Sequence, residues 1–116
     1  MHCQLISGTH ILGKKWTVVI IEEIFFSKKR RFNELVSETN VSPKILSKRL
    51  KELEQKDLIR RKGHIDNGES YYILTRKGKE FQKVIDNMKD FYIKWENMPD
   101  CKNMSCTECS FFKKSL

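Results

Sequence analysis

Long apolar runs are missing from this sequence of 116 residues. The longest run covers residues 18–21 and is followed by two glutamates, whereas a membrane-spanning helix needs about 20 apolar residues. The first residues also lack the basic-then-apolar layout of a signal peptide. We therefore expect a soluble, cytoplasmic protein that has no membrane partner.

The sequence motifs of enzymes are missing as well. There is no nucleophile–base–acid set, no phosphate-binding loop and no dinucleotide-binding fingerprint. The length is that of a single domain, and a composition with 39% hydrophobic and 33% charged residues is polar but globular. We expect one domain over residues 1–98, a cysteine-containing tail over residues 99–116, and no enzymatic activity.

Acidic residues are too few to balance the basic ones. The chain has 23 Lys and Arg against 15 Asp and Glu, which gives a net charge of +8. Residues 28–64 hold twelve basic and five acidic residues, so almost the whole excess lies in this segment. A solvated surface does not explain such segregation. We interpret the segment as a surface that contacts nucleic-acid phosphates.

Two helices joined by a short turn are predicted within the basic segment. The first covers about residues 33–38. The second begins with Ser42 as N-cap and Pro43 in the first helical position, and it ends near Lys56. A buried helix over about residues 16–26 precedes them, because that stretch is apolar on nearly every side.

The second of these helices has one apolar and one basic face. The apolar face is formed by Leu46, Leu50 and Leu53, with Ile45 beside them. The opposite face carries Lys44, Ser47, Lys48 and Lys51 at helical spacing. A helix, a turn and a second helix with a basic outer face are typical of a helix-turn-helix, whose second helix enters the major groove of DNA.

A basic hairpin follows the second helix. Residues 58–64 and 69–74 read as strands, and Asp66-Asn67-Gly68 between them is a strong turn signal. A hairpin in this place is a wing, which can touch the minor groove or the DNA backbone. With the basic connector before the first helix, the candidate DNA contacts are Arg30, Arg31, Ser42, Lys44, Ser47, Lys48, Lys51, Arg60, Arg61 and Lys62.

The last helix is predicted from the Thr75 cap to about Asn97, and it has an apolar stripe two heptads long. A small winged body has too little surface to bury such a stripe, although the stripe could also pack on the N-terminal segment of its own chain. We expect a homodimer seam, since two-fold symmetry allows two half-sites of a palindromic operator to be read. Its residues would be Leu5, Ile6, Ile11, Leu12, Phe81, Val84, Ile85, Met88, Phe91, Tyr92 and Trp95.

The order and spacing of these motifs resemble the HxlR-type winged helix-turn-helix regulators, relatives of the MarR group. The resemblance covers roughly residues 3–97 and is carried by Gly13–Thr17, Arg30–Leu35, Val41–Glu54, Asp57–Ile59 and Tyr72–Thr75 with Gly78. It implies an α+β, mainly α fold: a winged helix-turn-helix with a long C-terminal dimerisation helix. It also implies a homodimeric transcription regulator joined through its N- and C-terminal helices.

The resemblance also draws attention to one cysteine. The family places a cysteine thirteen residues before the tryptophan, which is Cys3 here, and in some members it senses oxidants or electrophiles. Two features depart from the family pattern. The wing turn lacks the usual proline-containing segment, and the tail beyond Pro99 has no counterpart.

Outside the predicted DNA-binding domain, the cysteines of the tail are the feature that most indicates a specific chemistry. Cys101, Cys106 and Cys109 include a C-x2-C pair, a spacing found in zinc and iron–sulfur sites. With Cys3 as fourth ligand, and His2 or His10 as less specific candidates, they could hold Zn²⁺ or an Fe–S cluster. The alternatives are a reversible thiol–disulfide switch and inert thiols.

Together these features predict a sequence-specific DNA-binding transcription regulator. We expect a dimeric repressor of double-stranded DNA whose affinity responds to cysteine redox or metal state. One alternative is a thiol-redox or metal-carrying protein that uses the winged fold for protein interaction. Another is a nucleic-acid binder without sequence preference.

Overall fold

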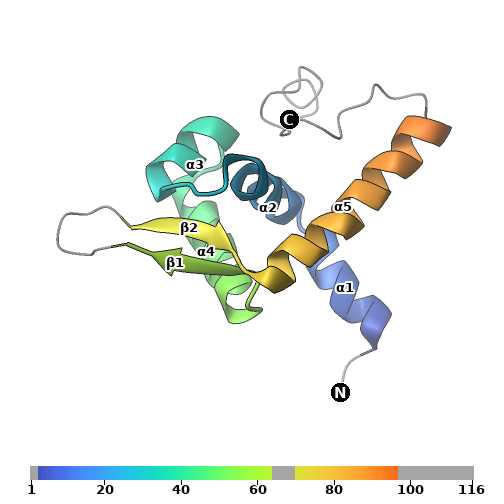
Figure 1. Ribbon diagram of the computed structural model, residues 1–116, viewed down its shortest axis with the longest axis horizontal. Helices are drawn as coiled ribbons and strands as arrows, with labels where there is room; N and C mark the ends of the chain where they lie inside the picture. Colours follow the sequence, from blue (N-terminus) through green and yellow to red (C-terminus); the bar gives the residue numbers. More distant parts are fainter. Residues whose placement is uncertain (1–2, 64–69, 97–116) are drawn as a thin grey trace.

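The computed structural model describes residues 3–63 and 70–96 (Figure 1). Five helices and one two-stranded sheet follow each other along this part of the chain: α1 (Gln4–Leu12), α2 (Lys15–Ser27), α3 (Phe32–Thr39), α4 (Pro43–Gln55), β1 (Ile59–Lys62), β2 (Tyr71–Leu74) and α5 (Arg76–Trp95). The mainly helical winged architecture predicted from the sequence is confirmed. Within the described residues, no helix is long and apolar enough to cross a membrane.

Helix α2 runs through the centre of the core. Ile20, Ile21 and Ile24 are fully buried, as the apolar pattern of this stretch predicts. Glu22 and Glu23 on the same helix are buried too, which the pattern does not predict. Both carboxylates are neutralised from neighbouring elements, Glu22 by Lys89 and Glu23 by Arg30.

The turn between α3 and α4 is held by local hydrogen bonds. The Thr39 hydroxyl donates to the Leu35 carbonyl over 2.6 Å and accepts from the Val41 amide over 3.3 Å. Asn40 ends α3 in the left-handed conformation, with φ of 60°, a role that asparagine fills more readily than most residues. Val41 is buried and anchors the turn to the core.

The wing is a short antiparallel hairpin. Ile59 pairs with Leu74 and Lys62 with Tyr71, so the strands are shorter than the predicted ones. The predicted turn at residues 66–68 lies outside the described residues. Arg30 forms an isolated bridge to Tyr72, which attaches the connector between α2 and α3 to the free edge of β2.

Helix α5 begins close to the wing and leads away from it. The Thr75 hydroxyl caps the helix by accepting the Gly78 amide over 3.0 Å, as expected for this residue type. The same hydroxyl donates to the Asp57 carbonyl over 2.6 Å. Figure 1 shows the far end of α5 and the N-terminal helix α1 on the side of the molecule opposite the wing.

Candidate nucleic-acid interface

Helix α4 presents a basic face to solvent. Leu46, Leu50 and Leu53 are buried beneath it, so the opposite side of the helix is held outward. On that side Lys44, Lys48 and Lys51 are exposed and Ser47 is half-buried. Ile45 was expected beside the buried leucines, but it is exposed; it lies on the flank of the helix, where the core does not reach.

The start of α4 is fixed by its own cap. The Ser42 hydroxyl accepts the Ile45 amide over 3.3 Å, and Pro43 occupies the first helical position. The Ser42 oxygen is the acceptor in this hydrogen bond. The hydroxyl can therefore still donate its hydrogen to a DNA phosphate. The predicted contact is therefore compatible with the cap.

Arg30 is paired with two carboxylates of its own chain. Its guanidinium lies 3.0 Å from a Glu23 oxygen and 3.2 Å from a Glu34 oxygen, and its side chain is only 26% exposed. Burial by itself lowers the pKa of Arg30, but the hydrogen bonds and charges of these two glutamates outweigh it and raise the pKa. This side chain joins α2 to α3, and its contact with DNA stays a prediction.

The neighbours of Arg30 in the connector point to solvent. Lys29 and Arg31 are exposed, and together with Ser27, Glu34 and Tyr71 they line a polar cleft of about 430 Å³. The Lys29 ammonium lies 5.1 Å from the centre of the Tyr71 ring, within cation–π range. Lys29 was not among the predicted contacts. Its signal was the basic run at residues 28–31, from which only the two arginines were selected.

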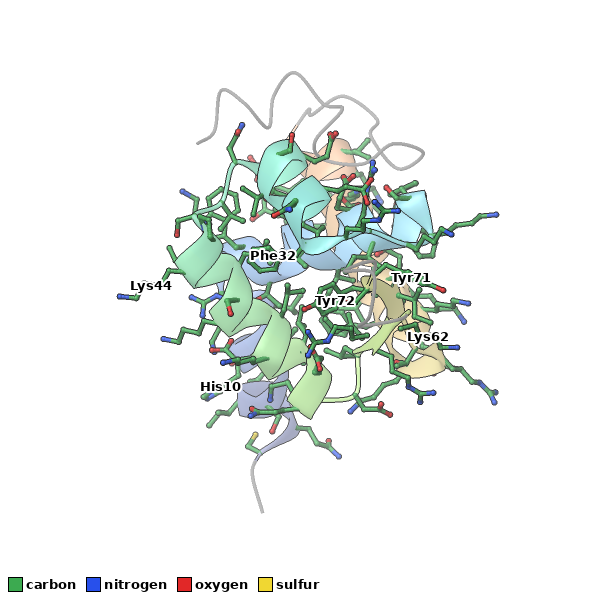
Figure 2. The ribbon with its side chains drawn as sticks, turned by 90° about the vertical axis from the view of Figure 1, so that its left-hand side faces the viewer. His10, Phe32, Lys44, Lys62, Tyr71 and Tyr72 are labelled. Atoms are coloured by element: carbon green, nitrogen blue, oxygen red, sulfur yellow. The ribbon has the colours of Figure 1, made fainter. Side chains whose placement is uncertain are left out.

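The three basic residues of β1 do not form one patch. Residues directly opposite in an antiparallel pair share a face, and Arg61 pairs with the buried Tyr72 whereas Lys62 pairs with the partly exposed Tyr71. Arg60 shares the face of Lys62. Figure 2 shows Lys62 and Tyr71 on one side of the molecule, Lys44 on the other, and Tyr72 between them.

Burial raises the pKa of Tyr72, and the charge of Arg61 partly opposes this shift. The carboxylate of Glu54 on α4 also acts on Tyr72 and raises its pKa further. Arg61 shares a face of the wing with the buried Ile59 and Tyr72, and β1 packs against α4, so Arg61 lies on the α4 side. The basic surface that could follow one DNA duplex is α4 with Arg61, while Arg60 and Lys62 extend from the opposite face of the hairpin.

A large apolar face lies away from this basic surface. Leu5 of α1 is 75% exposed and Trp95 of α5 is 66% exposed. Further exposed apolar residues of these helices are Ile6, Val84, Met88, Phe91 and Tyr92. Three residues of the expected seam contact the chain's own core: Ile85 is fully buried, and Ile11 and Phe81 pack against the core cluster. Ile85 and Phe81 lie on the side of α5 that contacts α2.

Cys3 is exposed at the start of α1. The backbone N–H groups of Ile6 and Leu5 lower the pKa of its thiol, because they stabilise the thiolate. Cys101, Cys106 and Cys109 lie outside the described residues. Over residues 3–63 and 70–96, no three Cys, His, Asp or Glu side chains gather as a metal site requires.

The sequence matches a known family over most of its length. The model of the HxlR-like helix-turn-helix family matches residues 11–100. The chain is 35% identical over 95 residues to the uncharacterised HTH-type transcriptional regulator MJ0925 of Methanocaldococcus jannaschii, covering 75% of this chain and 80% of that protein. It is 36% identical over 86 residues to the HTH-type transcriptional regulator YodB of Bacillus subtilis, covering 72% and 75%.

The fold is similar to solved structures of YodB from B. subtilis. The reduced form superposes with a TM-score of 0.69 at 30% identity, covering 86% of this chain and all of that one. The quinone-bound form gives the same TM-score and identity, covering 82% of this chain and all of that one.

Proposed function

The chain belongs to the HxlR-like helix-turn-helix family of transcriptional regulators, and from this premise we propose that it is a dimeric, cytoplasmic repressor of a palindromic operator whose affinity for DNA follows the state of its cysteines. The observation that carries the DNA-binding part is the exposed face of α4. Three ammonium groups and a hydroxyl stand on it, opposite three buried leucines. An α-helix of this kind fits the width of a major groove.

The dimer is proposed from the apolar face of α1 and α5. Phe91 and Trp95 of α5 and Leu5 of α1 are more than half exposed, and large apolar side chains gathered at the surface mark an interaction site. A second copy would cover it and place two α4 helices on one side of the assembly. Two symmetric half-sites in the operator follow from that symmetry.

The response to cysteine state is proposed from Cys3. Its thiol is exposed and its pKa is lowered by the start of α1, so it holds more of the reactive thiolate at neutral pH than an ordinary cysteine. The relative YodB has been solved in reduced, diamide-treated and quinone-bound forms. Diamide and quinones react with thiols. In the alternative, the four cysteines bind Zn²⁺ or an Fe–S cluster, which metal analysis of anaerobically purified protein would test.

The proposal is tested by titrating the full chain against a duplex from its own upstream region and against a shuffled duplex of equal composition. We expect tighter binding to the first, and a log–log salt slope of about −0.9 for each phosphate contacted. Lys48→Ala should weaken binding to both duplexes and reduce the slope by about one contact. Lys83→Ala, an exposed lysine on α5, serves as the control.

Each outcome has a defined meaning. Equal affinity for both duplexes identifies a binder without sequence preference. An affinity that does not change with salt concentration would show that the protein does not bind through phosphate contacts. If Lys83→Ala weakens binding as much as Lys48→Ala does, α4 is not the DNA-contacting helix.

A further inference from the structure

A cavity of about 570 Å³ is lined by residues at the end of α2, in strand β2 and at the start of α5. Its volume is within the range of sites for small organic ligands, about 300–1,000 Å³. It is separate from the outer face of α4 and from the polar cleft beside the wing. Its lining residues are Ile24, Phe25, Phe26, Lys28, Ile73, Leu74 and Lys79.

Most of the residues that line the cavity are apolar. Phe25 and Phe26 of α2 meet edge to face, with 5.2 Å between ring centres, an arrangement that stabilises both rings. Ile73 and Leu74 of β2 form the other wall. Phe25 is nevertheless 37% exposed, so an aromatic side chain at this site still presents apolar surface that a ligand could cover.

Every charged side chain that lines the cavity is cationic. Lys28 follows α2 and Lys79 lies in the first turn of α5. Among the described residues, neither ammonium group has a hydrogen bond or an ion pair, and no carboxylate lines the cavity. An anionic group of a bound ligand could form charge-assisted contacts with these ammonium groups.

The backbone at Lys28 supports a site rather than an ordinary surface loop. Lys28 has φ of 69° and ψ of −38°, a conformation that residues with a side chain rarely adopt. Such strained residues collect at functional positions. The strain here positions one of the two lysines that line the cavity.

We propose that this cavity binds a small amphipathic organic anion. Its apolar body, an aromatic ring or a short acyl chain, would lie against Phe25 and Ile73, and its carboxylate would lie between Lys28 and Lys79. A bound ligand would contact the wing strand and the first turn of α5 at once. The proposal does not depend on DNA binding, and its test does not measure it.

The test uses 2-naphthoate and its neutral counterpart 2-naphthalenemethanol, titrated into the full chain by calorimetry. We expect naphthoate to bind about tenfold more tightly than the alcohol or better, since only the anion forms charge-assisted contacts. Lys28→Gln and Lys79→Gln should each weaken naphthoate binding about tenfold and leave the alcohol unchanged. Lys83→Gln, one turn further along α5 and outside the lining, should alter neither.

Phe25→Ala provides a second variant for the apolar wall, and it should weaken both ligands alike. Thermal unfolding of each variant shows that it folds. The proposal is overturned if the full chain binds no naphthoate at millimolar concentration, which includes the case in which another segment or a second copy fills the cavity. Equal affinity for acid and alcohol overturns it too, as does naphthoate binding that none of the three lining variants weakens.

Discussion

Glu22 of α2 and Lys89 of α5 form an ion pair inside the protein. Glu22 is fully buried and Lys89 is only 9% exposed. The Lys89 ammonium also lies 5.5 Å from the centre of the Phe26 ring. The pair joins the central helix of the core to the helix that carries the exposed apolar face. It therefore fixes how α5 crosses α2, and with it the direction in which that face points.

Breaking this pair should destabilise the protein strongly. Lys89→Met leaves the Glu22 carboxylate buried without its cation, and we expect urea denaturation to show a loss of about 3–5 kcal/mol in the free energy of unfolding. The double variant Glu22→Leu/Lys89→Met should recover most of this loss, because two apolar side chains of similar size need no solvation. Lys83→Met is the exposed control. A change within about 0.5 kcal/mol for Lys89→Met would mean that the pair has no structural role.

Gly78 in the first turn of α5 should not tolerate any side chain. A Cβ atom there would lie 2.1 Å from the carbonyl oxygen of Leu58 and 3.3 Å from the Leu74 side chain. We expect Gly78→Ala to lower the free energy of unfolding by roughly 1–3 kcal/mol, although alanine favours helix. Gly8→Ala in α1 is the matched control, because its Cβ would meet nothing within 4 Å. Equal melting temperatures for the two variants would contradict this packing.

The sequence was most informative where the structural cause is local. Ser42 with Pro43 marks the start of α4, and Thr75 marks the start of α5, because a cap depends on residues three or four positions apart. The face that α4 buries follows from the spacing of its leucines. Those signals predicted the helix-turn-helix and its basic outer face, and the turn signal at residues 66–68 predicted the wing.

Ion pairs between residues that are distant in the sequence could not be predicted from such local signals. The partner of Glu22 is 67 positions away in the chain, and nothing in the local pattern of α2 points to Lys89. Arg30 was predicted to contact DNA because it stands in a basic run. Its carboxylate partner Glu23 lies in the preceding helix α2, and the local sequence gives no sign of this pairing. Only the Arg30–Glu34 contact, at i,i+4, was within reach of sequence reasoning.

Arg30 and Arg31 should separate stability from DNA binding, although they are neighbours. Arg30→Gln removes the cation beside the buried Glu23 carboxylate, and we expect a loss of about 2 kcal/mol, less than for a fully buried pair because the arginine is partly exposed. Its salt slope for DNA binding should stay unchanged. Arg31→Gln should change the free energy of unfolding less than Arg30→Gln does, and it should reduce the magnitude of the log–log salt slope by about 0.9. A reduced slope for Arg30→Gln would show that Arg30 contacts DNA in addition to pairing with Glu23.

Lowering the pH should weaken the contact between Glu52 of α4 and Lys14, the residue before α2. The Lys14 ammonium donates to Glu52 over 2.9 Å, and this bond, with the charges of Lys14, Arg49 and Lys48, lowers the pKa of Glu52. A lowered folded-state pKa stabilises the protein above the ordinary glutamate pKa of about 4.3, and this contribution is lost as pH falls through the lowered value.

Glu52→Gln should therefore cost roughly 0.5–1 kcal/mol at pH 7, and the difference from the parent should vanish at acidic pH. Chemical denaturation at a series of pH values measures it. The control is Glu38→Gln, whose carboxylate has no ion pair within the described part of the chain. A difference that stays constant down to acidic pH would show that Glu52 acts through packing and not through its charge.

Cys3 should react faster in the folded chain than in the unfolded chain. The amide of Ile6, and after it the amide of Leu5, lower the pKa of the thiol, so the thiolate fraction at neutral pH rises when α1 forms. We expect the pH midpoint of iodoacetamide alkylation at Cys3, followed by peptide mass spectrometry, to lie lower in buffer than in urea. Ile6→Pro removes the principal donor and should raise the midpoint, whereas Ile6→Ala keeps the donor and should not. Identical midpoints in buffer and urea would leave Cys3 an ordinary thiol, and the proposed response to oxidants would then have to begin at another cysteine.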